Sequence, residues 1–287
     1  MEKNIDRKKI KLLDIKTKKI SSDFFSGKYK SSFKGTGLDF SESREYRFGD
    51  DTRFIDWNVT ARTGKTHIKV FDEERKLNII IAVDVSASLD FSTQKFSKKE
   101  LAAEIAAVIG YSAEHSNDKV GLILFSDTVE KFIKPNDMKN FPTQIIHSIL
   151  SFIPKNSNTD ISAAAELLSK IIKRRSIIFF ISDFHDSGSF LKLKKLSARH
   201  DVICISLKDP FESSYLKAPA SITFFDFEKR QQFIIDLNSS TTNENFISAF
   251  SDYYAGLEKK INESNLRIIN ISTAENYIIR LYKFFKK

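Results

Sequence analysis

Short apolar runs alternate with stretches of helical periodicity from residue 78 onward. Runs without polar interruption are typical of strands buried on both faces of a sheet, and apolar residues three and four apart are typical of helices that cover such a sheet. The pattern predicts strands at residues 78–83, 120–125, 129–133, 177–182, 202–207 and 222–227, and helices at residues 100–113, 138–152 and 161–172. This alternation indicates an α/β fold with a doubly wound, mostly parallel, Rossmann-type sheet.

One pair of strands breaks the parallel pattern. Only three residues separate the runs 120–125 and 129–133, which is too few for a crossover to a parallel neighbour. We therefore expect an antiparallel hairpin and a single inverted strand at one edge of the sheet. Past Pro210 the pattern predicts a further strand at residues 232–237 and helices at residues 246–261 and 274–285, which we assign to the same domain, residues 78–287.

The first 34 residues are strongly basic. They hold eleven Lys or Arg against four Asp or Glu, so they carry most of the net charge of +9. Ile10, Leu13 and Ile20 share one side of a helix predicted at about residues 4–20. Two interpretations stay open: the stripe packs on the rest of the chain, or the basic face contacts an anionic membrane or nucleic acid. Because no nucleic-acid motif accompanies the lysines, a nucleic-acid partner is not expected, while peripheral membrane contact remains an alternative.

Residues 35–77 form a separate, β-rich segment in this interpretation. Arginines 44, 53 and 62 stand among acidic residues, which favours a structural ion network with Trp57 as its apolar anchor. Thr63-Gly64-Lys65 is typical of a turn between two strands, the second at residues 67–71. The expected division is thus an arm at 1–34, a small subdomain at 35–77 and a main domain at 78–287.

Composition is that of a water-soluble protein. With 41% hydrophobic residues and 26 phenylalanines the chain can build a sizeable core. No apolar run approaches the length of about 18 to 20 residues needed to span a bilayer, and the first residues lack the apolar stretch of a signal peptide. We expect a cytoplasmic protein. The single cysteine, Cys204, lies inside an apolar run and is expected in the core rather than as a reactive thiol.

Oxygen-bearing side chains follow two of the predicted strands. Asp84, Ser86 and Ser88 come directly after residues 78–83, and Asp183 comes after residues 177–182. Ligands of open α/β sheets gather beyond the carboxyl ends of the strands, so we expect these residues to meet there. Hydroxyl and carboxylate oxygens are the ligands that Mg²⁺ prefers. The alternative is that these residues only cap the following helix, which is common for Ser and Asp.

The pattern Asp84-x-Ser86-x-Ser88, followed by Thr159 and then Asp183, resembles the metal-ion-dependent adhesion site (MIDAS) of von Willebrand factor A (vWA) domains. The resemblance implies Mg²⁺ or Mn²⁺ bound directly by Ser86 and Ser88, with Thr159 direct or through water. It implies that Asp84 and Asp183 hold waters and hydroxyls around the ion. Such an ion keeps an open coordination position that accepts a carboxylate from a protein partner.

A second resemblance covers the segment upstream of the expected sheet. The stretches Gly37-Leu38-Asp39-Phe40, Ser43-Arg44-Glu45-Tyr46, Gly49-Asp50-Asp51-Thr52-Arg53-Phe54-Ile55-Asp56-Trp57 and Ala61-Arg62-Thr63-Gly64 are similar to the block that marks a bacterial family known as domain of unknown function fifty-eight. That family carries the block just before a vWA domain. The resemblance implies work beside AAA+ ATPases of the MoxR type, in a chaperone-like or complex-assembling pair.

Enzyme classes fit the sequence less well. A phosphatase of the haloacid dehalogenase type needs a second Asp where this chain has Ser86, and neither a serine-hydrolase elbow nor a phosphate-binding Gly-rich loop is present. His185, beside Asp183, stays a candidate for shaping the surroundings of the ion. We therefore expect a non-catalytic, metal-dependent protein-interaction module. The alternatives are a metal-dependent phosphatase-like hydrolase, or nucleic-acid or membrane binding through the basic arm.

Overall fold

The chain folds into two units. The computed structural model describes residues 7–25, 38–73, 76–90, 97–154, 158–184, 190–210, 221–226, 231–236 and 266–285, with a few single positions between 248 and 263. Residues 1–27 and 78–287 form one compact unit, here called the main unit, and residues 28–77 form the inserted unit. Among the described residues, no helix is both long enough and apolar enough to cross a membrane.

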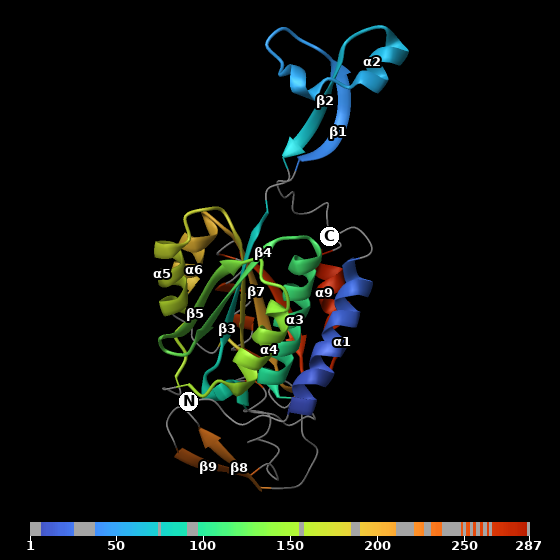
Figure 1. Ribbon diagram of the computed structural model, residues 1–287. Coiled ribbons are helices and arrows are strands. Elements are labelled where there is room, and N and C mark those ends of the chain that lie inside the picture. The colour runs from blue at the N-terminus through green and yellow to red at the C-terminus, as the bar shows by residue number, and fades with distance from the viewer. Residues whose placement is uncertain are drawn as a thin grey trace. The chain divides into compact units, whose positions relative to one another are not determined.

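A six-stranded sheet is the centre of the main unit (Figure 1). Its strand order is β10-β7-β6-β3-β4-β5, and every neighbouring pair is parallel except β4 with β5. The strands are β3 Asn78–Asp84, β4 Lys119–Phe125, β5 Val129–Asn136, β6 Ile177–Ser182, β7 Asp201–Lys208 and β10 Arg267–Ser272. The predicted fold class is confirmed, including the inverted edge strand that the hairpin spacing required.

Helices cover both faces of this sheet (Figure 1). One face carries α5 and α6, and the other carries α3 with α4, α1 and α9 around it. Their bounds are α1 Arg7–Phe25, α3 Lys98–His115, α4 Phe141–Ser151, α5 Ile161–Ile171, α6 Phe190–Ser197 and α9 Tyr277–Phe285. A short 3-10 helix, η3 Ala87–Asp90, follows β3.

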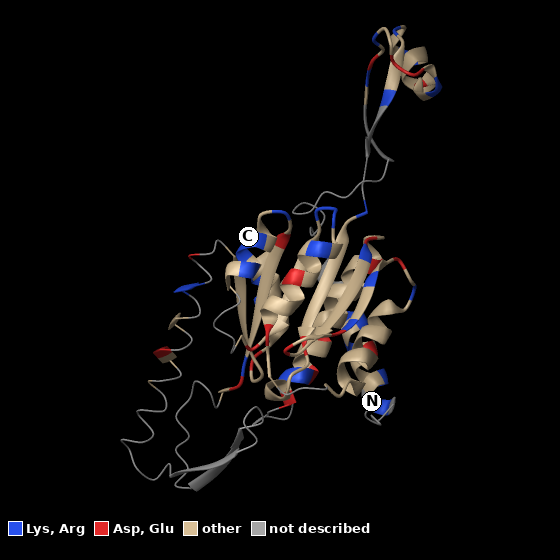
Figure 2. Ribbon diagram, turned by 90° about the vertical axis from the view of Figure 1, so that its left-hand side faces the viewer, with Lys and Arg blue, Asp and Glu red and all other residues tan. Residues whose placement is uncertain are grey.

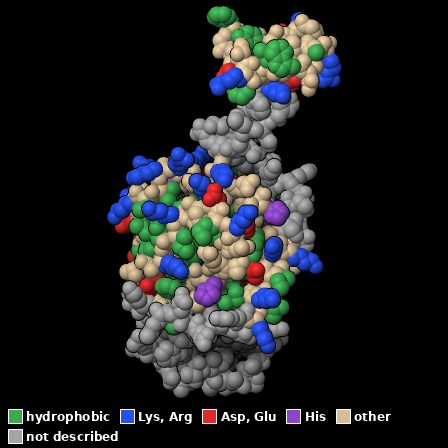
Figure 3. Space-filling model, in the orientation of Figure 1, with side chains coloured by type: hydrophobic (Ala, Val, Ile, Leu, Met, Phe, Trp, Pro, Cys, Tyr) green, Lys and Arg blue, Asp and Glu red, His purple; other side chains and the backbone are tan. Residues whose placement is uncertain are grey.

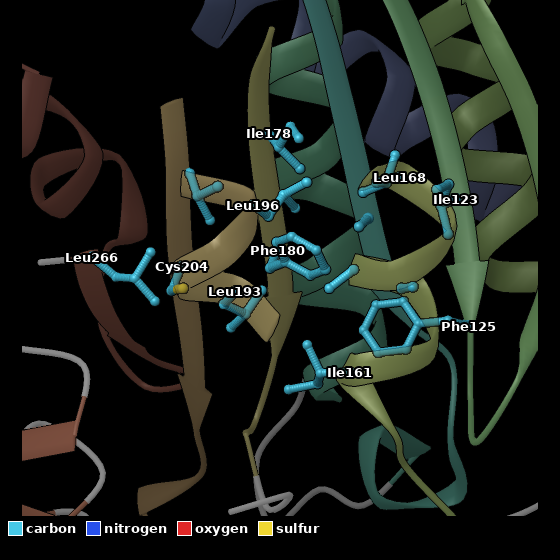
Figure 4. Packing of buried hydrophobic residues seen from close by; sticks show 14 of the residues in the cluster. Ile123, Phe125, Ile161, Leu168, Ile178, Phe180, Leu193, Leu196, Cys204 and Leu266 are labelled. Carbon is cyan, nitrogen blue, oxygen red and sulfur yellow. The ribbon is translucent and has the colours of Figure 1, made fainter. Parts of the chain in front are cut away.

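Alternate residues of the central strands fill a separate core on each face, as the period of two requires. On the α5 and α6 face, Phe125 and Phe180 meet edge to face with ring centroids 6.3 Å apart (Figure 4). Cys204 lies in the same cluster and is fully buried, which confirms its predicted place in the core. Burial also raises the pKa of its thiol to about 12, so the thiol stays protonated.

Two expectations for the carboxyl-terminal part need correction or lie largely outside the described residues, and two elements were not predicted. The run at residues 222–227 forms β8 Ser221–Asp226, which pairs with β9 Gln231–Asp236 in a separate antiparallel hairpin instead of joining the main sheet. The edge place is taken by β10, which the sequence analysis did not predict, and α6 was also missed. Most of the helix predicted at residues 246–261 lies outside the described residues.

The amino-terminal helix is part of the main unit. Leu13, Thr17 and Ser21 are buried where α1 packs on α3 and α4. Lys16 Nζ lies 2.7 Å from a carboxylate oxygen of Glu104 on α3, and Thr143 Oγ1 of α4 donates to Asp14 at 2.7 Å. The structure thus favours the packing interpretation of the arm. By their contacts, residues 1–27 belong with residues 78–287, whereas the expected division placed them in an arm that ended at residue 34.

The inserted unit is a hairpin with one helix. β1 Leu38–Glu45 pairs antiparallel with β2 His67–Glu73, and between them lie η2 Thr52–Phe54 and α2 Trp57–Thr63. The segment before Gly64 is therefore helical and not the strand that we expected. Asp56 caps α2 by accepting from the backbone N–H groups of Asn58 and Val59, and Gly64 ends it with a φ of 70°.

The ion pairs predicted for this segment lie within the inserted unit itself. Arg44 makes a two-point bond to Asp50, which lowers the pKa of that carboxyl to about 2. Trp57 is not an apolar anchor, because 70% of its surface is exposed. Figure 3 shows hydrophobic side chains in green on the surface of this unit, where Phe48 and Phe54 are exposed as well. Among the residues of this unit whose burial is described, Ile68 of β2 is a buried apolar residue.

Candidate metal centre

The candidate centre lies where two neighbouring strands end. β3 and β6 are parallel and in register from Ile79 opposite Ile177 to Val83 opposite Ile181, so Asp84 and Ser182 leave the sheet side by side. Asp84, Ser86 and Asp183 are fully buried. The two carboxylates that the sequence placed at the carboxyl ends of strands are therefore brought together by strand pairing.

Hydrogen bonds to both carboxylate oxygens hold the side chain of Asp84 in one orientation. Oδ1 accepts from the backbone N–H of Ser86 at 2.8 Å, and Oδ2 accepts from the Ser182 hydroxyl at 2.7 Å. A carboxylate engaged in this way is suited to orienting a hydroxyl or a water beside an ion. Sequence reasoning assigned no role to Ser182, because its contact with Asp84 depends on the register of β3 against β6.

The hydroxyls of Ser86 and Ser88 lie next to each other. Their Oγ atoms are 3.0 Å apart. Neighbouring ligands of an octahedral Mg²⁺ ion, each at roughly 2.0 to 2.1 Å from the metal, are separated by about 2.9 Å. The two hydroxyls thus have the spacing of one edge of an octahedral coordination shell.

Thr159 belongs to a loop that is fastened to the same region. The backbone N–H of Val85 donates to the carbonyl of Phe125 at 2.8 Å, and the N–H of Asp160 donates to the carbonyl of the next residue, Ser126, also at 2.8 Å. Both loops are therefore anchored to consecutive residues at the end of β4. Within the part of the chain that the structure describes, the buried Thr159 Oγ1 has no hydrogen-bond partner. A cation beside it would supply the missing interaction.

The backbone after Asp183 is held in an unusual conformation. Phe184 has a φ of 58°, in the left-handed region that a bulky residue rarely adopts. Its N–H donates to the Ser182 hydroxyl at 3.0 Å, and its ring is completely buried in the core on the α5 and α6 face. Core packing and this hydrogen bond together fix the turn that carries Asp183. Such strain is typical of functional sites.

Two buried carboxylates close together are stabilised by a cation beside them. Burial, together with the negative charge of Asp183, raises the pKa of Asp84 well above its ordinary value. One cation is already present in the protein: Lys98 Nζ lies 3.2 Å from Asp183 Oδ2, and both side chains are fully buried. Sequence reasoning missed Lys98. The available signal was a pair of lysines at the start of an alanine-rich helix, where acidic residues are usual.

Acidic residues follow three neighbouring strands of the main sheet. Asp84 ends β3, and Asp183 and Asp209 come directly after β6 and β7. Figure 2 shows both acidic (red) and basic (blue) residues at each end of the sheet, so the charge at the candidate centre is mixed and includes the buried Lys98.

The donor set fits a hard divalent cation. It combines the hydroxyls of Ser86, Ser88 and Thr159 with the carboxylates of Asp84 and Asp183, all oxygen donors of the kind that suits Mg²⁺ or Mn²⁺. Among the described residues, no group of three or more His, Cys, Asp or Glu side chains is arranged to hold a metal ion. A metal here therefore depends on serine and threonine hydroxyls. His185 lies outside the described residues.

Comparisons with known proteins give a family but no activity. A family model described as "Protein of unknown function DUF58" matches residues 42–254. Two similar curated proteins are the uncharacterized proteins Rv1480 of Mycobacterium tuberculosis and Mb1516 of Mycobacterium bovis. Each is 25% identical over 280 residues, which cover 96% of this chain and 87% of the relative.

Similar solved structures include two proteins of low sequence identity. BatB from Bacteroides thetaiotaomicron, a conserved hypothetical protein, is 15% identical with a TM-score of 0.49, covering 73% of this chain and 97% of its own. The VWA domain of SpRpn10 is 10% identical with a TM-score of 0.37, covering 73% of this chain and 93% of its own.

Proposed function

The chain belongs to the family described as Protein of unknown function DUF58, and on that premise we propose that it is a metal-dependent protein-interaction module. In this proposal, Mg²⁺ or Mn²⁺ binds beside Ser86 and Ser88, and a carboxylate of a protein partner completes its coordination. The module is non-catalytic and acts in the cytoplasm as an adaptor or co-chaperone in complex assembly. Its proposed partner is a MoxR-type AAA+ ATPase, as the resemblance of the upstream block implies.

One observation carries the metal part of this proposal. Two serine hydroxyls 3.0 Å apart stand beside two buried carboxylates that belong to neighbouring parallel strands. A structural role in capping alone does not require two buried carboxylates so close together, because like charges in a low-dielectric interior repel each other. A divalent ion removes that conflict.

The residues have separate tasks in this proposal. Ser86 and Ser88 bind the ion directly, and Thr159 Oγ1 adds a third neutral oxygen. Asp84 holds the Ser86 loop through the backbone N–H and holds Ser182 through its second oxygen. The ion, when bound, supplies an electrophilic position for an oxygen anion. Because most of the direct donors are neutral, much of its positive charge remains for the carboxylate of the partner.

Metal binding by purified protein tests the proposal. We expect isothermal titration calorimetry to detect Mg²⁺ or Mn²⁺ binding to the wild type and a loss of at least about tenfold in affinity for the double variant Ser86→Ala/Ser88→Ala. Ser169→Ala, at an exposed position on α5, is the matched control and should bind as the wild type does. Wild-type affinity in the double variant would rule out the proposed ligands.

Partner capture tests the second half of the proposal. A purified MoxR-type ATPase from the same organism should bind the immobilised wild type in Mg²⁺ and be released by a chelator. It should not bind the double variant under either condition. Equal capture with and without chelator would show that the interaction, if present, does not use the metal.

A further inference from the structure

Lys98 is one of the largest fully buried side chains of the protein, with 1% of its side chain exposed. Lysine is almost never buried to this degree unless it is paired, because removing the ammonium from water is costly. It forms an ion pair with Asp183, at 3.2 Å between Nζ and Oδ2. The buried lysine thus belongs to the candidate metal centre and not to a separate core cluster.

The position of Lys98 on α3 adds a second cost. It is the first residue of the helix, where the helix dipole disfavours positive charge. Capping does not explain it, because Ser97 already caps the helix by accepting from the N–H of Glu100 at 3.2 Å. The carboxylate of Asp183, just beyond the end of β6, offsets both costs through its ion pair with the ammonium.

The ammonium of Lys99, the next residue of α3, is also buried but binds different acceptors. Its Nζ donates to the carbonyl of Phe152 at 3.0 Å and lies 3.5 Å from Asp90 Oδ1. Lys99 is also buried, but its ammonium contacts neither Asp84 nor Asp183 in these pairs. The two neighbouring lysines therefore differ mainly in which acceptors their ammonium groups reach.

We propose that Lys98 is a tethered cation that replaces the metal as the counter-ion of Asp183 and lowers the affinity of the centre for divalent ions. The proposal rests on the proposed function, since it assigns a role toward the same ion. Without metal, the positive charge of the ammonium offsets the repulsion between the two buried carboxylates and so stabilises the folded protein. With metal, three positive charges face two carboxylates, so the ammonium repels the ion that enters.

Replacing Lys98 by methionine keeps much of the volume and removes the charge. In chelator, we expect Lys98→Met to melt about 5 to 15 °C below the wild type, because a buried carboxylate loses its partner. In calorimetry, the same variant should bind Mg²⁺ or Mn²⁺ about tenfold or more tightly than the wild type, because repulsion is removed. Lys99→Met is the matched control and should leave metal affinity unchanged.

The possible outcomes separate this inference from the proposed function. If the wild type binds metal and Lys98→Met binds with equal or lower affinity, the inference is wrong and the proposed function stands. If only Lys98→Met binds metal, the inference holds and the wild-type protein does not work through a metal. If neither binds, both are wrong.

Folding gives a second readout. If Lys98→Met folds only in saturating Mg²⁺, the ion has replaced the ammonium as proposed. A variant that stays unfolded even in saturating Mg²⁺ would overturn the inference.

Discussion

Gly121 of β4 lies close to the backbone of β5. A Cβ atom at this position would be 2.9 Å from the carbonyl oxygen of Ile133 and 3.0 Å from the nitrogen of Pro135, and both are backbone atoms that cannot rotate away. The inverted edge strand thus depends on a residue without a side chain. Gly110 on α3 differs, because its added Cβ would meet the side chains of Ile145 and Pro142 at 3.2 Å or more.

This contrast predicts opposite tolerance to alanine. Gly121→Ala should lower the free energy of unfolding by about 1 to 3 kcal/mol, as overpacking against fixed atoms does. Gly110→Ala should stay within about 1 kcal/mol of the wild type, because the gain in helix propensity offsets a contact that side chains can relieve. Urea unfolding followed by circular dichroism measures both. Equal stabilities of the two variants would contradict the close approach of β5.

At the residue scale, the sequence identified part of the candidate centre. Asp84, Ser86 and Ser88 follow an apolar run, and Asp183 follows another, so their meeting could be inferred from the rule for strand ends. Ser182 and Lys98 could not be found this way. Their roles depend on which strands are neighbours and on how the first turn of α3 is oriented, and neither is written in local periodicity. Ligation of a metal by these residues stays a prediction.

Helix α1 carries an apolar stripe beside its lysines, as the spacing of Ile10, Leu13 and Ile20 predicted. Leu13 is 5% exposed on a helix that packs against α3 and α4, whereas its neighbour Leu12 is 69% exposed. The ion pair between Lys16 and Glu104 adds a polar contact at the edge of the buried stripe. One side of the basic helix is therefore committed to the main unit, which limits any contact with a membrane or nucleic acid to its opposite side.

The two adjacent leucines provide a test of this packing. Leu13→Ala should destabilise the main unit by about 2 to 4 kcal/mol, because it leaves a cavity between α1 and α3. Leu12→Ala should change stability by less than about 0.5 kcal/mol, as is usual for exposed positions. Thermal and urea unfolding of the full chain give both values. If the two variants are equally stable, α1 does not contribute to the cooperative fold.

Strand and helix identity followed from pattern where a run was long and uniformly apolar, as for β3 and β6. The sequence pattern did not predict two short elements, β10 and α6. β10 has only a brief isoleucine-rich run with a polar Asn270 inside it, and α6 has just three buried residues, Phe190, Leu193 and Leu196, among lysines. Conversely, β8 has the composition of a sheet strand, but among the described strands its partner is β9 and not a strand of the main sheet. Tertiary context, which local sequence does not encode, decides such cases.

At the scale of the whole molecule, the inserted unit interrupts the main unit between α1 and β3. Its described strands pair from Leu38 with Glu73 to Glu45 with His67, so the chain enters and leaves this unit through adjacent strands. Residues of each unit mainly contact other residues of the same unit, so the chain divides into residues 28–77 and the rest. The main unit does not need the insertion to complete its sheet.

Excision of the insertion tests this independence. A variant with a flexible Gly/Ser linker in place of residues 28–77 should keep the circular dichroism spectrum expected of the α/β unit and one cooperative unfolding transition. The Leu13→Ala change should destabilise this shortened protein as much as it destabilises the full chain. A shortened protein that fails to fold with linkers of several lengths would show that residues 28–77 support the main unit.

The paired strands that join the insertion to its host have an evolutionary consequence. A segment whose two attachment points are neighbours can be lengthened, trimmed or exchanged in a single recombination event without re-threading the fold around it. The exposed aromatic surface formed by Phe48, Phe54 and Trp57 can then change independently, while the α/β scaffold stays under the constraints of its buried core.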